Sequence, residues 1–395
     1  MRWLALLLVV FASPSGAQDF TGFAKVEADA SRIVDTQAGL ALTLQLSQIV
    51  PYRVFTLTDP ERLVLDFREV DWTGLDVSAF DQSEAATLVH FGLLRPGWSR
   101  MVVELVGPMI IGQAGATVEQ SDGRATVEVS LETSDVETFA RLSGAPQDAR
   151  WGEVFDSAVL QAPLPEDGPL VVVIDPGHGG IDPGAEHGGV NEADLMLSLA
   201  IEVAEALNRT GGIRAILTRE TDVFVPLNSR MTIARQNGAK LLISLHADAL
   251  AEGQARGGSV YTLSDAAASV AARRMAERHQ RGDLIAGLDL SDQDDRVASV
   301  LMDLARAKTG PQGSRFAAAL VAELEEEGVR LHRNALRRGP LAVLNAADFA
   351  SVLFEVGYLS NDRDRAILQS ADSRKPIVDA IVSAVTLWAL EEETR

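Results

Sequence analysis

The 395-residue sequence contains no cysteine. This absence excludes disulfide bonds, a cysteine nucleophile and a cysteine-ligated zinc, so the fold must be held together by its apolar core. Basic residues are also scarce, because 35 Lys and Arg stand against 56 Asp and Glu, for a formal net charge of −21. So acidic a chain repels the phosphates of nucleic acid, and we expect no nucleic-acid partner.

Long apolar runs are scarce as well. One run of ten, Trp3–Ala12, lies near the start of the sequence. It is too short for a membrane anchor, which needs about 20 residues to span a bilayer. Arg2 precedes it and the small residues Ser15 and Ala17 follow it, which is the pattern of a secretory signal peptide. We therefore expect residues 1–17 to be cleaved after Ala17, leaving an exported protein without a transmembrane anchor.

What is present is enough apolar material for a sizeable core, since 47% of the residues are hydrophobic. The length predicts two or three domains. Residues 18–133 alternate apolar and polar positions in short stretches such as Arg62–Phe67, Met101–Gly107 and Ala125–Glu132, separated by turn dipeptides of Asp, Pro and Gly. This pattern predicts an all-β sandwich.

Residues 134–168 lose this pattern, and we interpret them as a linker with a short helix over 136–142. From residue 169 to 395, strands alternate with helices, which predicts an α/β domain with a mostly parallel sheet flanked by helices. A buried strand is expected at Val171–Asp175. The first helix has Leu195, Leu199, Val203 and Leu207 on one face. Further strands are predicted over 213–219, 241–249, 258–263, 341–344 and 351–357, and further helices over 226–238, in three stretches within 266–327, and from 376 to 392.

The glycine-rich stretch Val171–Ala185, VVVIDPGHGGIDPGA, could turn the chain, bind a phosphate or hold a metal. A phosphate loop needs Lys followed by Ser or Thr, or a third glycine where Asp182 stands. The helix would also have to begin directly after the loop, but it is expected only near Asn191. We therefore do not expect this loop to bind a phosphate.

A metal site is the stronger interpretation. In α/β sheets, sites gather beyond the carboxyl ends of the strands. His178 follows the first strand, Glu192 begins the next helix and His246 ends the strand LLISL. Two imidazoles and one carboxylate, with a position left for water, are the ligand set of a catalytic zinc. Lone histidines usually have no such role, and we assign none to the four others, which are His90, His187, His279 and His332.

Glu355 lies in the apolar stretch SVLFEVGYLSN, inside or at the end of a strand. Burying a carboxylate is costly unless it is paired or performs chemistry. Two interpretations follow: a salt bridge with an arginine, or a general base next to the metal.

Five ordered motifs make the segment from Val171 to about Trp388 resemble the zinc-dependent N-acetylmuramoyl-L-alanine amidases of the amidase-3 type. They are Ile174–Ala185, the Glu in Gly188–Leu197, Thr218–Arg230, Ser244–Ala249 and Phe354–Asn361. The resemblance implies hydrolysis of the amide between N-acetylmuramic acid and L-alanine in peptidoglycan. It implies Zn²⁺ held by His178, Glu192 and His246, with Glu355 as the catalytic base and no other cofactor. Asp248 is a candidate additional ligand, or a residue that orients a ligand from behind.

The form HADA, with a helical insert at about 264–310, is similar to the division-associated amidases of Gram-negative bacteria. That similarity implies a periplasmic enzyme of daughter-cell separation and an activator protein with a LytM-type domain. It also implies that the insert regulates the site, because the stretch Ala268–Gln280 matches a helix that covers the zinc. Glu277 is the candidate residue that blocks the metal, and the alternative is an ordinary solvated surface helix.

The N-terminal region resembles the AMIN domain through Pro51–Phe67 and Phe91–Leu105, which implies peptidoglycan binding and targeting to the division site. The sequence departs from the amidase pattern at Ala193, Asn345 and Ala350, outside the ligand set. Two rival functions stay open at this point. One is a zinc peptidase that cuts within the stem peptide, and the other is a catalytically inactive peptidoglycan-binding or activator protein.

Overall fold

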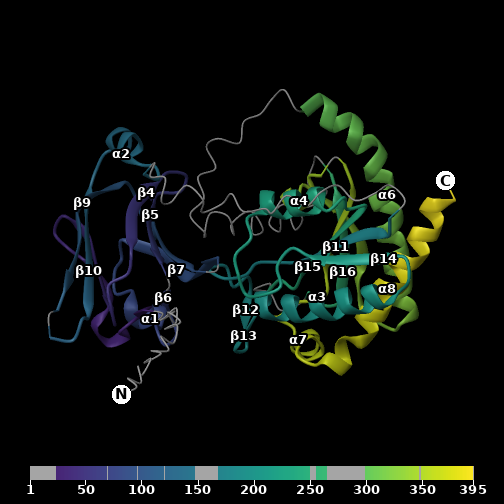
Figure 1. Cartoon of the computed structure of the whole chain (residues 1–395), viewed down its shortest axis with the longest axis horizontal. Coiled ribbons are helices and arrows are strands. Elements are labelled where there is room, and N and C mark those ends of the chain that lie inside the picture. The colour runs from purple at the N-terminus through teal and green to yellow at the C-terminus, as the bar shows by residue number, and fades with distance from the viewer. Residues whose placement is uncertain are drawn as a thin grey trace, which may run out of the picture.

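The computed structural model describes residues 24–68, 70–95, 97–119, 121–146, 168–249, 255–264, 299–346 and 348–394. Figure 1 shows two regions, an N-terminal one built of strands and a C-terminal one of strands and helices. The fold class predicted from the sequence is confirmed in both.

Two four-stranded antiparallel sheets form the N-terminal region, in the orders β2-β3-β10-β9 and β4-β5-β8-β7, and β1 pairs with β6. The strands are β1 (Ala24–Lys25), β2 (Arg32–Asp35), β3 (Gly39–Leu46), β4 (Tyr52–Leu57), β5 (Arg62–Arg68), β6 (Val70–Asp71), β7 (Ala86–Arg95), β8 (Trp98–Leu105), β9 (Met109–Val118) and β10 (Ala125–Thr133). The short helices are η1 (Ala28–Ala30), α1 (Val77–Phe80) and α2 (Val136–Leu142). The helix predicted over 136–142 is therefore confirmed, whereas η1 and α1 were not predicted.

Alternation along the strands produces the core between the two sheets. On β3, Leu40, Leu42, Leu44 and Leu46 are buried while the residues between them are half-buried. Each buried leucine contributes about 1.5–3 kcal/mol to folding. A register shift of one residue would turn all four to the other face, so the pairing is strongly specified.

The C-terminal region has a six-stranded sheet in the order β14-β11-β15-β18-β16-β17, in which only the β16–β18 pairing is antiparallel. Its strands are β11 (Leu170–Pro176), β14 (Ile213–Leu217), β15 (Leu241–His246), β16 (Gly258–Leu263), β17 (Leu331–Gly339) and β18 (Ala350–Glu355), and a small hairpin pairs β12 (Glu186–His187) with β13 (Val190–Asn191). The helices are α3 (Glu192–Arg209), α4 (Leu227–Gln236), α6 (Ser299–Glu326), η2 (Ala342–Leu344), α7 (Asp362–Leu368) and α8 (Ala371–Glu393).

Strand β11 shows why this sheet is covered on both faces. Val172 and Ile174 pack in one cluster with residues of α3, α6 and α8. Val171 and Val173 point to the opposite face and pack with α4 and η2. A strand buried on both faces needs a continuous apolar run, and that run continues to Ile174.

The observed elements of this region differ from the predicted ones in several places. The stretch Leu341–Leu344 is mostly a 3₁₀ turn instead of a strand, because the Leu344 and Asn345 amides bond back to the turn while Val343 packs on the core. Strand β17 was missed because its sequence is rich in arginine, as suits a sheet edge. Helix α8 begins at Ala371, and Pro376 lies inside it. Of the three helical stretches predicted within 266–327, α6 is seen, and residues 265–298 lie outside the described residues.

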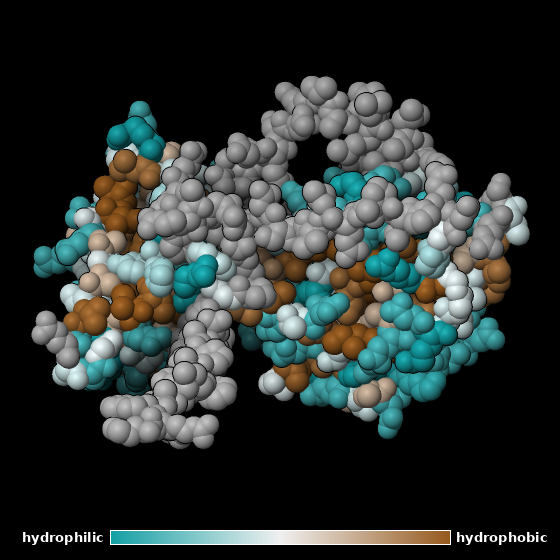
Figure 2. Space-filling model, in the orientation of Figure 1, coloured by the Kyte–Doolittle hydropathy of each residue, from teal (hydrophilic) through white to brown (hydrophobic). Residues whose placement is uncertain are grey.

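Among the residues that the structure describes, no helix combines the length and the hydropathy needed to cross a membrane. Figure 2 shows many hydrophilic side chains on the outer surface of the C-terminal region. The apolar residues of α3, including the four leucines and valines of its predicted face, instead lie in the core.

Candidate metal centre and active site

The carboxyl ends of three neighbouring parallel strands meet at the site. Strand β15 lies between β11 and β18, and the register places Pro176 beside Leu245 and His246 beside Glu355. The segment after β11 carries His178, and Glu192 is the first residue of α3. The topology therefore brings together the four residues that the sequence singled out.

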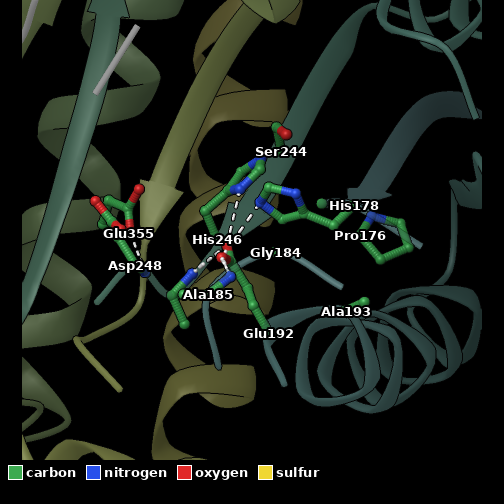
Figure 3. A network of polar contacts seen from close by, with 12 residues as sticks. Pro176, His178, Gly184, Ala185, Glu192, Ala193, Ser244, His246, Asp248 and Glu355 are labelled. Carbon is green, nitrogen blue, oxygen red and sulfur yellow. Dashed lines mark hydrogen bonds and ion pairs between the residues drawn. The ribbon is translucent and has the colours of Figure 1, made fainter. Parts of the chain in front are cut away.

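Glu192 lies between the two imidazoles (Figure 3). Its Oε2 is 3.2 Å from His178 Nε2, and its Oε1 is 2.9 Å from His246 Nδ1. The two rings are 5.0 Å apart between centroids and nearly perpendicular. One donor atom from each of the three residues lies within 4.8 Å of the others, and this is the one such cluster of His, Asp and Glu in the described parts of the chain.

The Glu192 carboxylate is held in place on both oxygens. The Ala247 amide donates to Oε1 at 2.9 Å, and the Ala185 amide donates to Oε2 at 3.0 Å. Burial by itself raises the pKa of Glu192, but His178 and His246 outweigh burial and hold it well below its ordinary value. The carboxylate is therefore ionised and fixed, as a metal ligand must be.

His178 has an unusual backbone and a partner behind it. Its φ of 58° is left-handed, which is uncommon for a residue other than glycine. Its Nδ1 is 2.7 Å from Asp182 Oδ2, so the other ring nitrogen is directed to Glu192. Burial lowers the pKa of His178, but Asp182 and Glu192 outweigh burial and raise it well above its ordinary value.

This arrangement fits a divalent cation. A metal-ligating histidine usually passes its second ring N–H to a carboxylate, as His178 does to Asp182. Two imidazoles and one carboxylate are the donors that zinc prefers. The buried carboxylates of Asp182 and Glu192 also favour a positive charge between the rings.

Two glycines of the loop lie where a side chain would collide with a residue of the cluster. In the structure, a Cβ at Gly177 would lie 2.3 Å from the His246 ring. A Cβ at Gly184 would lie within 2.8 Å of both His178 and Glu192. These two glycines therefore make room for the ligand side chains themselves.

Sequence reasoning assigned no role to two buried arginines of the motif Thr218–Arg230. Arg219 donates to the carbonyls of Pro176, Gly177 and Ala193 at 2.8–3.1 Å. Arg230 donates to the carbonyls of Pro176 and His178 at 2.7 and 2.9 Å. Both arginines hold the backbone on either side of the loop that carries His178. The signal for them in the sequence is their place in the motif Thr218–Arg230.

Glu355 is fully buried at the end of β18, and its Oε2 accepts a hydrogen bond of 3.1 Å from the Asp248 amide. Figure 3 shows Glu355 and Asp248 together beside the cluster of His178, Glu192 and His246. Burial raises the pKa of Tyr261 to about 12, and Glu355 also contributes to this rise.

Asp248 does not belong to the three-residue cluster. Glu277 and His279 lie outside the described residues, and the cluster contains none of His90, His187 and His332.

The donor set and its place in the sheet are typical of the catalytic centre of a metal-dependent hydrolase. The Amidase_3 family pattern, described as N-acetylmuramoyl-L-alanine amidase, matches residues 172–387. The chain is 28% identical to the amidase AmiC of Escherichia coli O6:H1, covering 92% of this chain and 90% of that one. It is 30% identical to AmiC of Neisseria meningitidis serogroup B, covering 90% and 88%. AmiA of Escherichia coli K12 is 36% identical over 55% of this chain and 75% of its own length.

Among solved structures, the amidase AmiC2 of Nostoc punctiforme is 25% identical with a TM-score of 0.40, covering 58% of this chain and 99% of that one. The chain belongs to the Amidase_3 family of N-acetylmuramoyl-L-alanine amidases, and its activity is the hydrolysis of that amide in peptidoglycan. The amidase prediction is confirmed, and neither rival function finds support in these similarities.

Proposed function

We propose that the enzyme is a zinc amidase in which His178, Glu192 and His246 hold the ion. The observation that carries the proposal is Glu192 between two imidazoles, with Asp182 behind one of them. When bound, the ion would polarise the scissile carbonyl and lower the pKa of a water molecule. Zinc is preferred to magnesium or calcium because imidazole donors suit zinc and those two ions select oxygen.

Glu355 is the general base in this proposal. It takes a proton from the attacking water and passes it to the leaving amine of L-alanine, while the lactyl group of N-acetylmuramic acid keeps the carbonyl. Its position supports the role, because it ends β18 directly beside His246 at the end of β15. The Asp248 amide holds one of its oxygens, so Asp248 helps to orient the base, and the Asp248 side chain is a further candidate contact to the ion.

The test is Glu355→Gln, with the exposed Glu186→Gln in the neighbouring hairpin as the matched control. A general base contributes about 10²–10⁴-fold, so release of stem peptide from purified sacculi should fall by that factor in Glu355→Gln. Bound zinc, counted by elemental analysis, should stay at one per chain in both variants. Normal peptide release from the Glu355 variant would remove Glu355 from its role.

The regulatory part of the proposal concerns residues outside the described ranges. A helix at residues 268–280, within the insert at about 264–310, would cover the zinc, with Glu277 as the blocking group, until a LytM-type activator moves it. Deleting residues 268–280 should raise the activity of the enzyme alone on sacculi. Unchanged activity would show that this segment does not block the site.

The whole chain has a role in cell separation in this proposal. Residues 1–17 direct export to the periplasm, residues 18–133 form an AMIN-like domain that binds peptidoglycan, residues 134–168 are the linker and residues 169–395 the catalytic domain. The similarity to two AmiC proteins over at least 90% of this chain supports a shared architecture. Co-sedimentation of a full chain carrying Glu355→Gln with sacculi tests the binding, and a chain recovered only in the supernatant would contradict it.

A further inference from the structure

The outer face of the sheet β4-β5-β8-β7 carries a buried apolar cluster beside the ion pairs of Asp66, although the opposite face of the same sheet already forms the sandwich core. In a sandwich, residues on the outer face ordinarily meet water and are polar. Here Val64 is 0% exposed, Val102 3% and Trp98 6%. This face must therefore be covered by something outside the sandwich.

Part of the cover comes from the catalytic region. Ile181 and Phe224 are 1% and 5% exposed, and they belong to the same apolar cluster as Phe55, Leu94 and Trp98 of the β region. Ile181 lies three residues after His178 and directly before Asp182. The N-terminal β region therefore packs on the loop that carries a metal ligand.

The backbones of the two regions touch at glycines on both sides of this contact. A Cβ at Gly92 of β7 would lie 2.8 Å from Ile181 Cα and 2.9 Å from the Gly180 carbonyl oxygen. A Cβ at Gly180 would lie 1.9 Å from the Leu93 carbonyl oxygen and 2.6 Å from the Phe224 nitrogen. No side chain fits on either side, so the approach depends on glycine at both positions.

The contact is connected to the metal ligand by a short series of bonds. The Gly179 amide and the Asp182 carbonyl bond to each other at 2.7 Å, which closes the turn that contains Gly180 and Ile181. The Asp222 carboxylate accepts the Gly180 amide at 2.7 Å on the other side. Asp182 then holds His178 Nδ1. Fixing Ile181 thus fixes the carboxylate that orients the imidazole.

We propose that the N-terminal β region is a positioning part of the metal centre: its outer sheet face clamps Gly180–Asp182 and so holds His178 in its left-handed, metal-binding orientation. The two regions are then coupled, since anything that displaces the β region weakens metal binding. This inference rests on the proposed metal site. It concerns a surface whose sequence, Phe91–Leu105, was interpreted only as part of a targeting domain.

The test is Gly92→Leu in the full chain. The nearest atoms to the added side chain all belong to Gly180 and Ile181, so the substitution wedges the two regions apart without filling the sandwich core. Gly115→Leu is the matched control, because a Cβ at Gly115 on β9 of the same β region meets nothing within 4 Å. Phe224→Ala removes an apolar side chain from the catalytic side of the same contact. It replaces Gly92→Leu in the test if that variant does not fold.

Three measurements are made on each variant. Amide hydrogen exchange of the metal-free protein should rise in peptides spanning residues 177–185 and 222–226 for Gly92→Leu but not for Gly115→Leu. Metal affinity, measured by competition with a chelator, should fall about 10–100-fold. This is the usual effect of losing a contact that orients a metal ligand. The visible spectrum of the Co²⁺-substituted protein should change, because a displaced imidazole alters the coordination geometry.

Two results would overturn the proposal. Faster exchange with unchanged metal affinity and an unchanged Co²⁺ spectrum would show a contact that does not position His178. Unchanged exchange would show that the clamp does not hold the loop. Failure of the parent and Gly115→Leu proteins to bind metal would instead refute the proposed metal site, while the exchange result on metal-free protein would still decide the contact.

Discussion

Each region of the molecule buries an aspartate against arginine, and the two networks differ in what they reach. In the β region, Asp66 receives Arg100 at 2.5 and 2.9 Å and Arg53 at 2.7 Å, from the residues directly opposite on neighbouring strands. In the α/β region, Asp175 receives Arg230 at 2.7 Å, Thr218 at 2.5 Å and Ser244 at 2.7 Å.

Among the contacts given above, those of the first network join strands of one sheet, whereas the second network continues to the backbone of His178. Arg230 also donates to the His178 carbonyl. The same ion-pair chemistry therefore joins neighbouring strands at Asp66, and at the carboxyl end of β11 it supports the candidate site. Place in the topology decides between these roles, since both aspartates are fully buried.

The largest effect should come from removing the arginines, as Arg230→Met and Arg100→Met. Each change leaves a buried carboxylate short of its partner, and breaking a buried pair costs about 3–5 kcal/mol. Urea unfolding should show this loss in both variants. Only Arg230→Met should also weaken metal binding in a chelator competition, because only Arg230 contacts the ligand loop. Equal metal affinities for the two variants would show that the Asp175 network supports the metal site no more than the Asp66 network does.

A smaller effect is expected at Asp182, which contacts the ligand itself. Asp182→Asn should weaken metal binding about 10–100-fold, because an amide orients the His178 imidazole less well than a carboxylate. The control is Asp222→Asn, since Asp222 bonds the Gly180 amide of the same loop but no imidazole. Both affinities come from the same competition titration. If Asp222→Asn lost as much affinity as Asp182→Asn, the imidazole contact would not be the cause.

The smallest effect is on the pH dependence of stability. Burial raises the pKa of Asp66 and of Asp175, but their arginine partners outweigh burial and lower both below the ordinary value. A carboxyl whose pKa is lower in the folded state stabilises above its unfolded pKa of about 3.9, and this contribution is lost as pH falls through the folded pKa. The free energy of unfolding should therefore fall as pH decreases below about 4. Asp66→Asn or Asp175→Asn should make this fall less steep, and an unchanged slope in both would contradict the assignment.

The cluster of His178, Glu192 and His246 could be predicted from the sequence because parallel strands place their carboxyl ends at one edge of the sheet. His246 ends such a strand, His178 lies two residues beyond the end of another, and Glu192 begins a helix whose apolar period is plain in the sequence. Glu355 was recognisable as a carboxylate in an apolar strand. These are local patterns in the sequence. The order of the strands in the sheet then brings the residues close together.

What could not be predicted depends on contacts between distant segments. Gly177 makes room for the His246 ring, 69 residues further along the chain, and Gly92 makes room for Ile181 of the other region. The apolar stretch Leu341–Leu344 predicts a strand, but the Leu344 and Asn345 amides bond back within a turn while Val343 packs on the core. No periodicity in the sequence encodes which segments meet.

The proposed mechanism requires a metal at His178, Glu192 and His246 for hydrolysis of the bond between N-acetylmuramic acid and L-alanine. Mass spectrometry tests this on muropeptides from sacculi digested with enzyme that is untreated, chelated, or chelated and then resupplied with zinc. We expect free stem peptides and intact glycan with untreated enzyme, no release after chelation, and recovery with zinc. Release that persists in chelated enzyme, or cuts that fall within the stem peptide, would contradict it.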